Sequence, residues 1–349
     1  MYNLGEQFKN KNINNLVTNK KMVFSGNKYR ISVLTERLLR LEYSVDGIFN
    51  NYETVNIKNR NFDMPEFSKQ EDESTLRIET PNFVLTYSKN TSFSSRTLNV
   101  KQNDKIIWYY GSKEVRNLGG TIISLDDNRP ELSKGLFALD GIATIDDSTS
   151  LCFDEGSNVI NNPTSKNYID LYLFIYGKDF GMCLMDYYKL TGMPPLIPRY
   201  ALGNWWSREY HYKDSDVLDL IDKFRRHNVP LAVFMLDNGW SRKDDKYKDI
   251  ETGFSFNQEE YPNLEEFIKT VHEKGIKLGV KINPQYGFYP FEDYFEMASK
   301  YLTVNKQGFI DFNPYDMKNI DVLLKLFIHP LEQKGIDILW NDYYELDRN

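Results

Sequence analysis

Cysteine and histidine are scarce in this sequence of 349 residues. The two cysteines, Cys152 and Cys183, are too few for a disulfide framework and predict buried free thiols. The four histidines lack the spacing of metal ligands, so we expect no metal site. The sequence also has no phosphate-binding loop and no nicotinamide fingerprint, and we therefore expect no cofactor.

Long apolar runs and a surplus of basic residues are missing as well. No apolar stretch reaches the length that spans a bilayer, and the opening "MYNLGEQFKNKNINN" lacks the apolar core of a secretory signal. We therefore expect a cytoplasmic protein without a membrane partner. Acidic residues outnumber basic ones by 50 to 43, for a net charge of −7, which argues against a nucleic-acid partner.

Aromatic residues are abundant, at 15% of the chain with 24 Tyr and 22 Phe. Such residues line sugar-binding clefts, but they also fill β-rich cores, so composition leaves both interpretations open. The length favours two domains.

The first half of the chain has the pattern of short strands. Segments such as "KYRISVLTERLLRLEYS" alternate apolar and polar residues and are separated by Pro, Asn, Asp and Gly. This pattern predicts an antiparallel β-sandwich over residues 1–191. The proline-rich stretch "GMPPLIPRY" favours extended backbone and predicts a linker at 192–199.

From residue 200 the hydrophobic period changes. Apolar strands alternate with amphipathic helices, which is typical of parallel βα units. We predict that residues 200–349 form the first half of a TIM-type (β/α)8 barrel, with about four βα units. The expected strands are 200–206, 230–240, 277–287 and 336–345, and the expected helices are 215–229, 263–276 and 317–335, the last kinked at Pro330.

Polar and aromatic residues gather where each predicted strand ends. Any one of them could simply cap the next helix, but all four strands show the same pattern at the same end. In a β/α barrel these ends lie on one face, which carries the active site. Carboxylates and amides pair with hydroxyl groups, and aromatic rings cover a pyranose, so the pattern indicates sugar chemistry. The residues are Asn204, Trp205, Trp206 and Arg208; Asp237, Asn238 and Trp240; Asn283, Gln285 and Tyr286; and Asn341, Asp342 and Glu345.

The sequence resembles glycoside hydrolase family 31, the α-glucosidase and α-xylosidase family of retaining enzymes. The resemblance rests on "LTGMPPLIPRYALGNWWSR", "VPLAVFMLDNGW", "HEKGIKLGVKINPQYG" and "PLEQKGIDILWNDYYE". It extends to the first half through "NLGGTIISLDD" and "GLFALDGIATIDDS". The resemblance implies a retaining exo-α-glycosidase whose substrate is an oligosaccharide or α-glycoside.

Site residues are also implied by the resemblance. Asp342, in the motif W-x-D-x-x-E, would be the nucleophile that forms a covalent glycosyl-enzyme. Asp237 would bind sugar hydroxyls, and Glu345 would position the nucleophile. Arg208 and Asn283 are further candidates for substrate binding. The tryptophans Trp205, Trp206, Trp240 and Trp340 are candidate pocket walls, although adjacent Trp205 and Trp206 face opposite ways and one of them should be buried.

Two features depart from the family pattern. The segment "NDYYE" replaces the Met and Asn that many α-glucosidases have between the carboxylates, which leaves α-galactosyl and α-N-acetylgalactosaminyl substrates open. The family's general acid lies on a later strand, so we expect a fragment truncated after strand 4, with little activity alone and self-association through the open half-barrel. A non-catalytic carbohydrate-binding or interaction protein is the alternative. A barrel enzyme of unrelated chemistry would need a metal or phosphate site.

Overall fold

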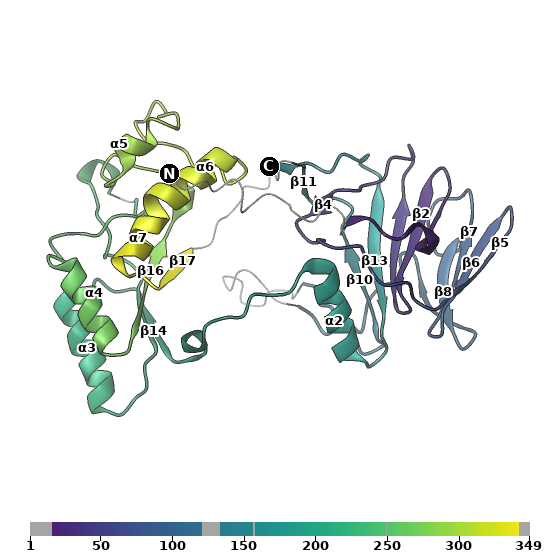
Figure 1. The fold of residues 1–349 in the computed structure, drawn as a ribbon, viewed down its shortest axis with the longest axis horizontal. Helices are drawn as coiled ribbons and strands as arrows, with labels where there is room; N and C mark the ends of the chain where they lie inside the picture. Colours follow the sequence, from purple (N-terminus) through teal and green to yellow (C-terminus); the bar gives the residue numbers. More distant parts are fainter. Residues whose placement is uncertain (1–15, 121–132, 156–157, 249, 342–349) are drawn as a thin grey trace. The chain divides into compact units, whose positions relative to one another are not determined.

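The computed structural model describes residues 16–120, 133–155, 158–248 and 250–341. Between Pro194 and Pro195 the chain passes from one compact unit to a second one (Figure 1). The predicted site residues Asp342 and Glu345 lie outside the described part of the chain. Among the described helices, none combines the length and the apolar character that crossing a bilayer requires.

The N-terminal unit contains two five-stranded antiparallel sheets that share one hydrophobic core. Ile31, Leu41 and Leu173 of one sheet pack with Leu85 and Trp108 of the other. The predicted β-rich first half is therefore confirmed. The first sheet has the order β1 (Val23–Ser25), β2 (Tyr29–Thr35), β3 (Leu38–Tyr43), β13 (Ile169–Ile175), β10 (Ile142–Asp146); the second has the order β5 (Ser68–Glu71), β6 (Thr75–Glu79), β7 (Val84–Ser88), β8 (Leu98–Gln102), β9 (Lys105–Tyr109).

Smaller elements cover the outer face of the first sheet. They include helix α2 (Phe180–Thr191), which begins where the Asp179 side chain accepts a hydrogen bond from the Met182 N–H. Cys183 on this helix and Cys152 are both buried free thiols, as predicted. The remaining short elements are η2 (Lys20–Met22) and a three-stranded sheet of β12 (Val159–Ile160), β11 (Cys152–Phe153) and β4 (Glu53–Thr54).

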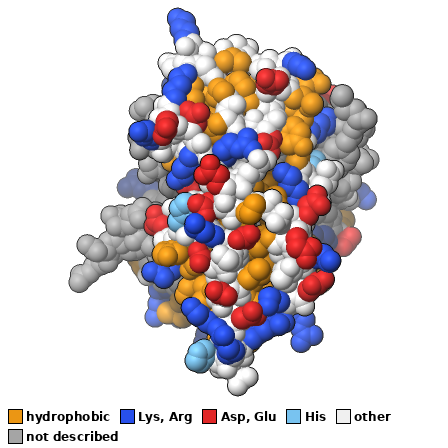
Figure 2. Space-filling model, turned by 90° about the vertical axis from the view of Figure 1, so that its left-hand side faces the viewer, with side chains coloured by type: hydrophobic (Ala, Val, Ile, Leu, Met, Phe, Trp, Pro, Cys, Tyr) orange, Lys and Arg blue, Asp and Glu red, His pale blue; other side chains and the backbone are white. Residues whose placement is uncertain are grey.

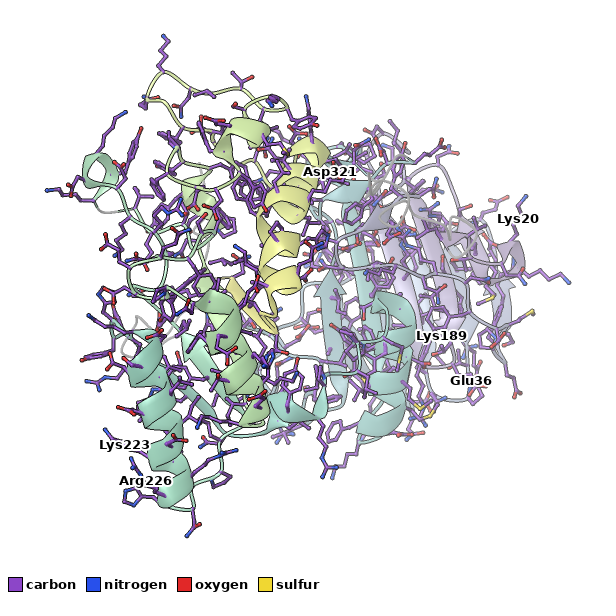
Figure 3. The ribbon with its side chains drawn as sticks, turned by 60° about the vertical axis from the view of Figure 1, so that its left-hand side comes forward. Lys20, Glu36, Lys189, Lys223, Arg226 and Asp321 are labelled. Atoms are coloured by element: carbon purple, nitrogen blue, oxygen red, sulfur yellow. The ribbon has the colours of Figure 1, made fainter. Side chains whose placement is uncertain are left out.

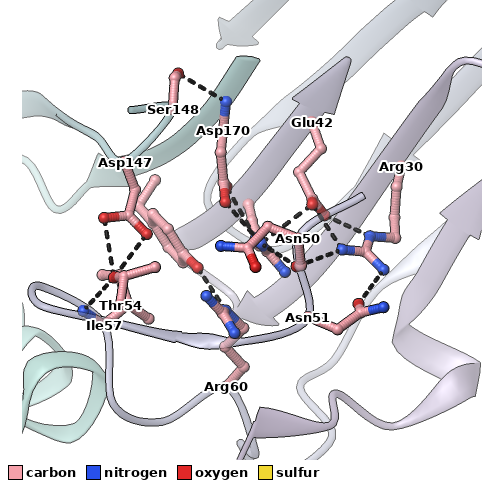
Figure 4. A network of polar contacts seen from close by, with 12 residues as sticks. Arg30, Glu42, Asn50, Asn51, Thr54, Ile57, Arg60, Asp147, Ser148 and Asp170 are labelled. Carbon is pink, nitrogen blue, oxygen red and sulfur yellow. Dashed lines mark hydrogen bonds and ion pairs between the residues drawn. The ribbon is translucent and has the colours of Figure 1, made fainter. Parts of the chain in front are cut away.

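A network of buried charges lies on the same outer face (Figure 4). Arg40 donates to both oxygens of Asp170, at 2.9 and 2.6 Å, and lies 3.1 Å from Glu42. Arg30 donates to both oxygens of Glu42, at 2.5 and 2.6 Å. The guanidinium of Arg60 donates to Tyr172 Oη at 2.8 Å. Alternation along β3 and β13 places Arg40, Glu42 and Asp170 opposite the core, but loops bury them there.

The C-terminal unit is built on a parallel sheet. Four strands are described, in the order β14 (Trp205–Arg208), β15 (Val233–Leu236), β16 (Lys277–Ile282), β17 (Ile338–Asn341). Phe234, Leu236, Val280 and Ile282 point to one face of this sheet and pack with the helices in a single core. The predicted parallel βα half is therefore confirmed as a partial barrel region.

The helices begin and end as the sequence suggests. Gly275 and Gly335 adopt positive φ directly after two of them, which matches glycine's role at helix C-termini. The last turn of α3 carries Lys223 and Arg226, whose charges favour the C-terminal end of a helix dipole (Figure 3). The bounds are α3 (Asp214–Arg226), α4 (Leu264–Glu273), α5 (Phe295–Ala298), α6 (Met317–Val322) and α7 (His329–Lys334), with short turns η3 (Arg199–Leu202), η4 (Asp245–Tyr247) and η5 (Pro284–Tyr286).

Two local predictions differ from the structure. The strand predicted at 200–206 forms only from Trp205, because residues 199–202 make a 3₁₀ turn. The helix predicted at 317–335 is divided into α6 and α7 by a π-helical segment, η6 (Leu323–Ile328), and Pro330 lies in the first turn of α7. Proline cannot donate a backbone hydrogen bond, so the ladder widens before it.

Basic and acidic side chains are interspersed on the face of the molecule that Figure 2 shows, with hydrophobic side chains between them. This pattern is typical of a solvated helical surface.

Candidate active site

A small cavity lies at the carboxyl ends of the parallel strands. Its volume is about 130 Å³, and it is on the side of the sheet that faces away from the helices. Register explains the grouping, because Ser207 is paired with Met235 and Lys281 with Trp340, so these side chains share one face. The lining residues are Ser207, Met235, Asp237, Lys281 and Trp340.

Two of the predicted residues, Asp237 and Trp340, therefore lie together. The side chain of Asp237 follows β15 directly and is 23% exposed. Trp340 in β17 is 49% exposed, which leaves much of its ring uncovered. A carboxylate beside an exposed indole suits a ligand with both hydroxyl groups and an apolar face.

Lys281 was missed by the sequence analysis. Its Nζ lies 3.2 Å from Asp237 Oδ1 and 3.5 Å from Asn238 Oδ1, while Asn238 donates to Glu209 at 2.9 Å. The available signal was a lysine among apolar residues in "KLGVKI", on the face that the helices do not cover. The polar pattern at the strand ends does not include Lys281, because Lys281 stands two residues before Asn283.

The prediction that Trp240 forms a pocket wall is wrong. Its side chain is 1% exposed and packs against Phe256 with ring centroids 4.6 Å apart. Gly239 has φ +81°, a left-handed conformation that turns the chain back after Asp237. The indole therefore lies in the helix-side core, and its Nε1 donates a hydrogen bond to Lys281 O at 3.2 Å.

Asn283 also has a structural position instead of the predicted place in the pocket. It is buried, and its Nδ2 donates to Glu251 O at 2.8 Å, which ties β16 to the loop after β15. Gly253 in that loop has φ +77° and passes so close to Lys281 O that a Cβ there would collide with it. These contacts fix the backbone on which the Lys281 side chain is mounted.

The two neighbouring tryptophans face opposite ways, as expected. Trp206 packs into the helix-side core and donates to Tyr212 Oη at 3.1 Å, so it cannot serve as a pocket wall. Trp205 points to the other face, and its Nε1 donates to Ala201 O at 3.1 Å. Arg208 is exposed, with its guanidinium 5.0 Å from the Tyr210 ring centroid.

A buried carboxyl group joins the two loops that follow β15 and β16. Glu292 is 5% exposed, its Oε1 accepts a hydrogen bond from Thr252, and Oε2 has no partner among the described residues. Burial raises the pKa of Glu292 to about 7, against the smaller lowering effects of Ser255, Thr252 and Arg242. This group therefore titrates near neutral pH, and it connects the loops that follow β15 and β16.

Asp337 shows that not every strand-flanking aspartate is a site residue. It precedes β17, at the amino end of the sheet, and receives hydrogen bonds from Lys277 Nζ at 2.7 Å and Leu278 N at 3.0 Å. Burial would raise its pKa, but the bonds from Lys277, Leu278 and His272 lower it. At this end of a barrel such contacts stabilise the fold.

The sequence of the parallel half matches a known domain. Residues 194–348 fit the family model described as the Glycosyl hydrolases family 31 TIM-barrel domain. Residues 194–348 are thus similar to the TIM-barrel domain of glycoside hydrolase family 31, and we call them the family 31 region. All the residues that line the cavity lie in this region.

Curated relatives agree with this assignment. The chain is 30% identical over 183 residues to an α-xylosidase of Saccharolobus solfataricus, covering 51% of this chain and 23% of the relative. It is also 30% identical over 192 residues to α-glucosidase 2 of Bacillus thermoamyloliquefaciens, again covering 51% and 23%. The chain thus spans about a quarter of the length of these relatives.

Solved structures share the fold at low sequence identity. A Flavobacterium johnsoniae GH31 dextranase in complex with glucose has a TM-score of 0.63 and 15% identity, covering 93% of this chain and 47% of the dextranase. A GH31 α-xylosidase from a soil metagenome in complex with xylose has a TM-score of 0.62 and 14% identity, covering 92% and 56%.

Proposed function

We propose that this chain contributes the nucleophile side of the active site of a retaining exo-α-glycosidase. The observation that carries the proposal is the cavity at the strand ends, where Asp237, Lys281 and Trp340 meet. Trp340 stands two residues before Asp342 in the motif W-x-D-x-x-E. Family 31 relatives include an α-xylosidase and an α-glucosidase, and two proteins of this fold hold glucose and xylose. A terminal α-linked pyranose is therefore the proposed substrate.

In the proposed reaction, the Asp342 carboxylate attacks the anomeric carbon and the bond to the leaving oxygen breaks. That oxygen takes a proton from a general acid to which we assign no residue of this chain. Water then attacks the anomeric carbon of the glycosyl-enzyme, its proton passes to the now deprotonated general acid, the bond to Asp342 breaks, and the sugar leaves with retained configuration. Asp237 accepts hydrogen bonds from sugar hydroxyls, and Trp340 covers an apolar face of the ring.

A mechanism-based fluorosugar tests the nucleophile without depending on the general acid. With 5-fluoro-α-D-glucosyl fluoride the leaving group is fluoride, which departs without protonation. We expect mass spectrometry to find one fluoroglucosyl group on the peptide that contains Asp342, and none in Asp342→Asn. Any turnover of an aryl α-glycoside should fall by about 10³-fold or more in that variant.

The same experiment separates the alternatives. Binding of methyl α-glycosides without labelling of Asp342 would support a non-catalytic carbohydrate-binding protein. Faster labelling by the galactosyl than by the glucosyl analogue would support the α-galactosyl branch. Self-association through the open side of the half-barrel stays a prediction, and sedimentation velocity across a range of concentrations measures it.

A further inference from the structure

The side chain of Lys281 lines the cavity because of its position in strand β16. Val280 and Ile282, its neighbours in β16, are buried in the helix-side core. Alternation therefore directs Lys281 to the opposite face, where it is paired in register with Trp340 of β17. A lysine side chain in contact with solvent alone would be largely exposed, whereas the Lys281 side chain is only 23% exposed.

The base of this side chain is held rigidly. Its carbonyl oxygen accepts a hydrogen bond from the buried Trp240 indole at 3.2 Å. The Gly253 backbone packs against the same carbonyl, and only a glycine fits there. Groups that recognise a ligand are most selective when the surrounding contacts fix their position.

The polar surface of the cavity combines a donor with an acceptor. Lys281 offers only N–H donors, and Asp237 offers only acceptor oxygens. Their charged atoms are 3.2 Å apart, but Asp237 Oδ1 accepts no well-directed hydrogen bond from the described residues. A sugar hydroxyl that lies beside this pair, within hydrogen-bond distance of both groups, can donate to the carboxylate and accept from the ammonium group at the same time. The opposite charges also cancel, which favours a neutral ligand.

We infer that Lys281 is a specificity-determining residue that, together with Asp237, selects neutral pyranosides with a free hydroxyl group at this wall of the cavity. The inference rests on the proposed function, because it places a sugar in the same cavity. Lys281 lies within β16 and not after its end, and its side chain forms part of the cavity wall. Trp340, the neighbour of Lys281 in β17, then contacts the sugar ring beside that hydroxyl group.

The test compares Lys281→Met and Lys281→Arg with the unchanged chain. Lys281→Met keeps the length of the stem and removes the charge, and Lys281→Arg restores a cation. The matched control is Lys269→Met on α4, which removes an exposed lysine away from the cavity. Isothermal titration measures the affinity for methyl α-D-glucopyranoside and for its four monodeoxy analogues, and circular dichroism checks that each variant is folded.

We expect Lys281→Met to bind the parent glycoside at least 10-fold more weakly, because a charge-assisted hydrogen bond is lost. Lys281→Met and the unchanged chain should bind one of the monodeoxy analogues with equal affinity, since that analogue lacks the hydroxyl that Lys281 contacts. Lys281→Arg should recover part of the affinity. A purely structural lysine would instead weaken all five ligands by the same factor, and this result would overturn the inference.

Labelling by the fluorosugar distinguishes a failure of the Lys281 inference from a failure of the glycosidase proposal. If Asp342 is labelled but Lys281→Met binds and reacts like the unchanged chain, the role of Lys281 is wrong and the glycosidase proposal stands. If the unchanged chain neither binds these glycosides nor becomes labelled, both proposals fail together.

Discussion

Replacing Arg40 by methionine is expected to lower the free energy of unfolding of the N-terminal unit by about 3 to 5 kcal/mol. Arg40 is 3% exposed and binds both oxygens of Asp170. Burial would lower its pKa, but the carboxylates of Asp170 and Glu42 raise it well above its ordinary value. Methionine fills the space of the stem but leaves Asp170 charged, buried and without its principal partner.

Hydrogen exchange of the full chain measures this effect locally. Amides of β3 and β13 should exchange about a hundredfold faster or more in Arg40→Met, because local opening costs less free energy. The control is Arg77→Met, which breaks the exposed ion pair with Glu79 and should change stability by less than about 1 kcal/mol. Adding Asp170→Leu to Arg40→Met should restore part of the protection. Equal exchange in the two single variants would contradict the prediction.

The second large effect concerns Glu292, whose pKa is raised from 4.5 to about 7. A carboxyl group with a raised pKa stabilises the folded state when it is protonated. Its contribution is therefore complete below pH 4.5 and is lost as the pH rises through about 7. The difference between these pKa values corresponds to about 3 kcal/mol at pH 9. Asp293 raises this pKa further, while the nearby hydroxyl groups of Ser255 and Thr252 and the Arg242 cation oppose the increase.

Glu292→Gln should remove this dependence, because the amide keeps an acceptor for Thr252 but does not titrate. We expect hydrogen exchange in the segment from Thr252 to Ser255 to become faster between pH 4.5 and about 7 in the unchanged chain, after correction for the intrinsic rate, and to level off at higher pH. The corrected exchange should stay flat in Glu292→Gln. The exposed Glu259→Gln should behave like the unchanged chain. The same slope in Glu292→Gln would assign the dependence to another group.

The sequence predicted the broad architecture because that depends on hydrophobic period. Short alternating strands gave the antiparallel half, and apolar strands between amphipathic helices gave the parallel half. It did not predict that Arg40 and Glu42 would be buried. Alternation shows that both point away from the core of Ile31 and Leu41, but whether loops cover that face depends on contacts with residues far along the chain.

The candidate site was predicted unevenly for similar reasons. Asp237 and Trp340 follow directly from strand direction, and the structure places both at the cavity. Trp240 depends on the single left-handed residue Gly239, whose conformation the local pattern does not reveal. Lys281 lies within a strand. A lysine that faces the cavity cannot be distinguished by sequence from one at an exposed sheet edge until the register with the neighbouring strands is known.

The distribution of tryptophans gives the two units separate optical reporters. Trp108 is the only tryptophan before residue 205, and it is 4% exposed in the sandwich core, whereas the other four belong to the family 31 region. In Trp108→Phe, all indole emission comes from the second unit, and a red shift there reports its loosening alone. Subtracting that spectrum from the spectrum of the unchanged chain isolates the emission of the sandwich core.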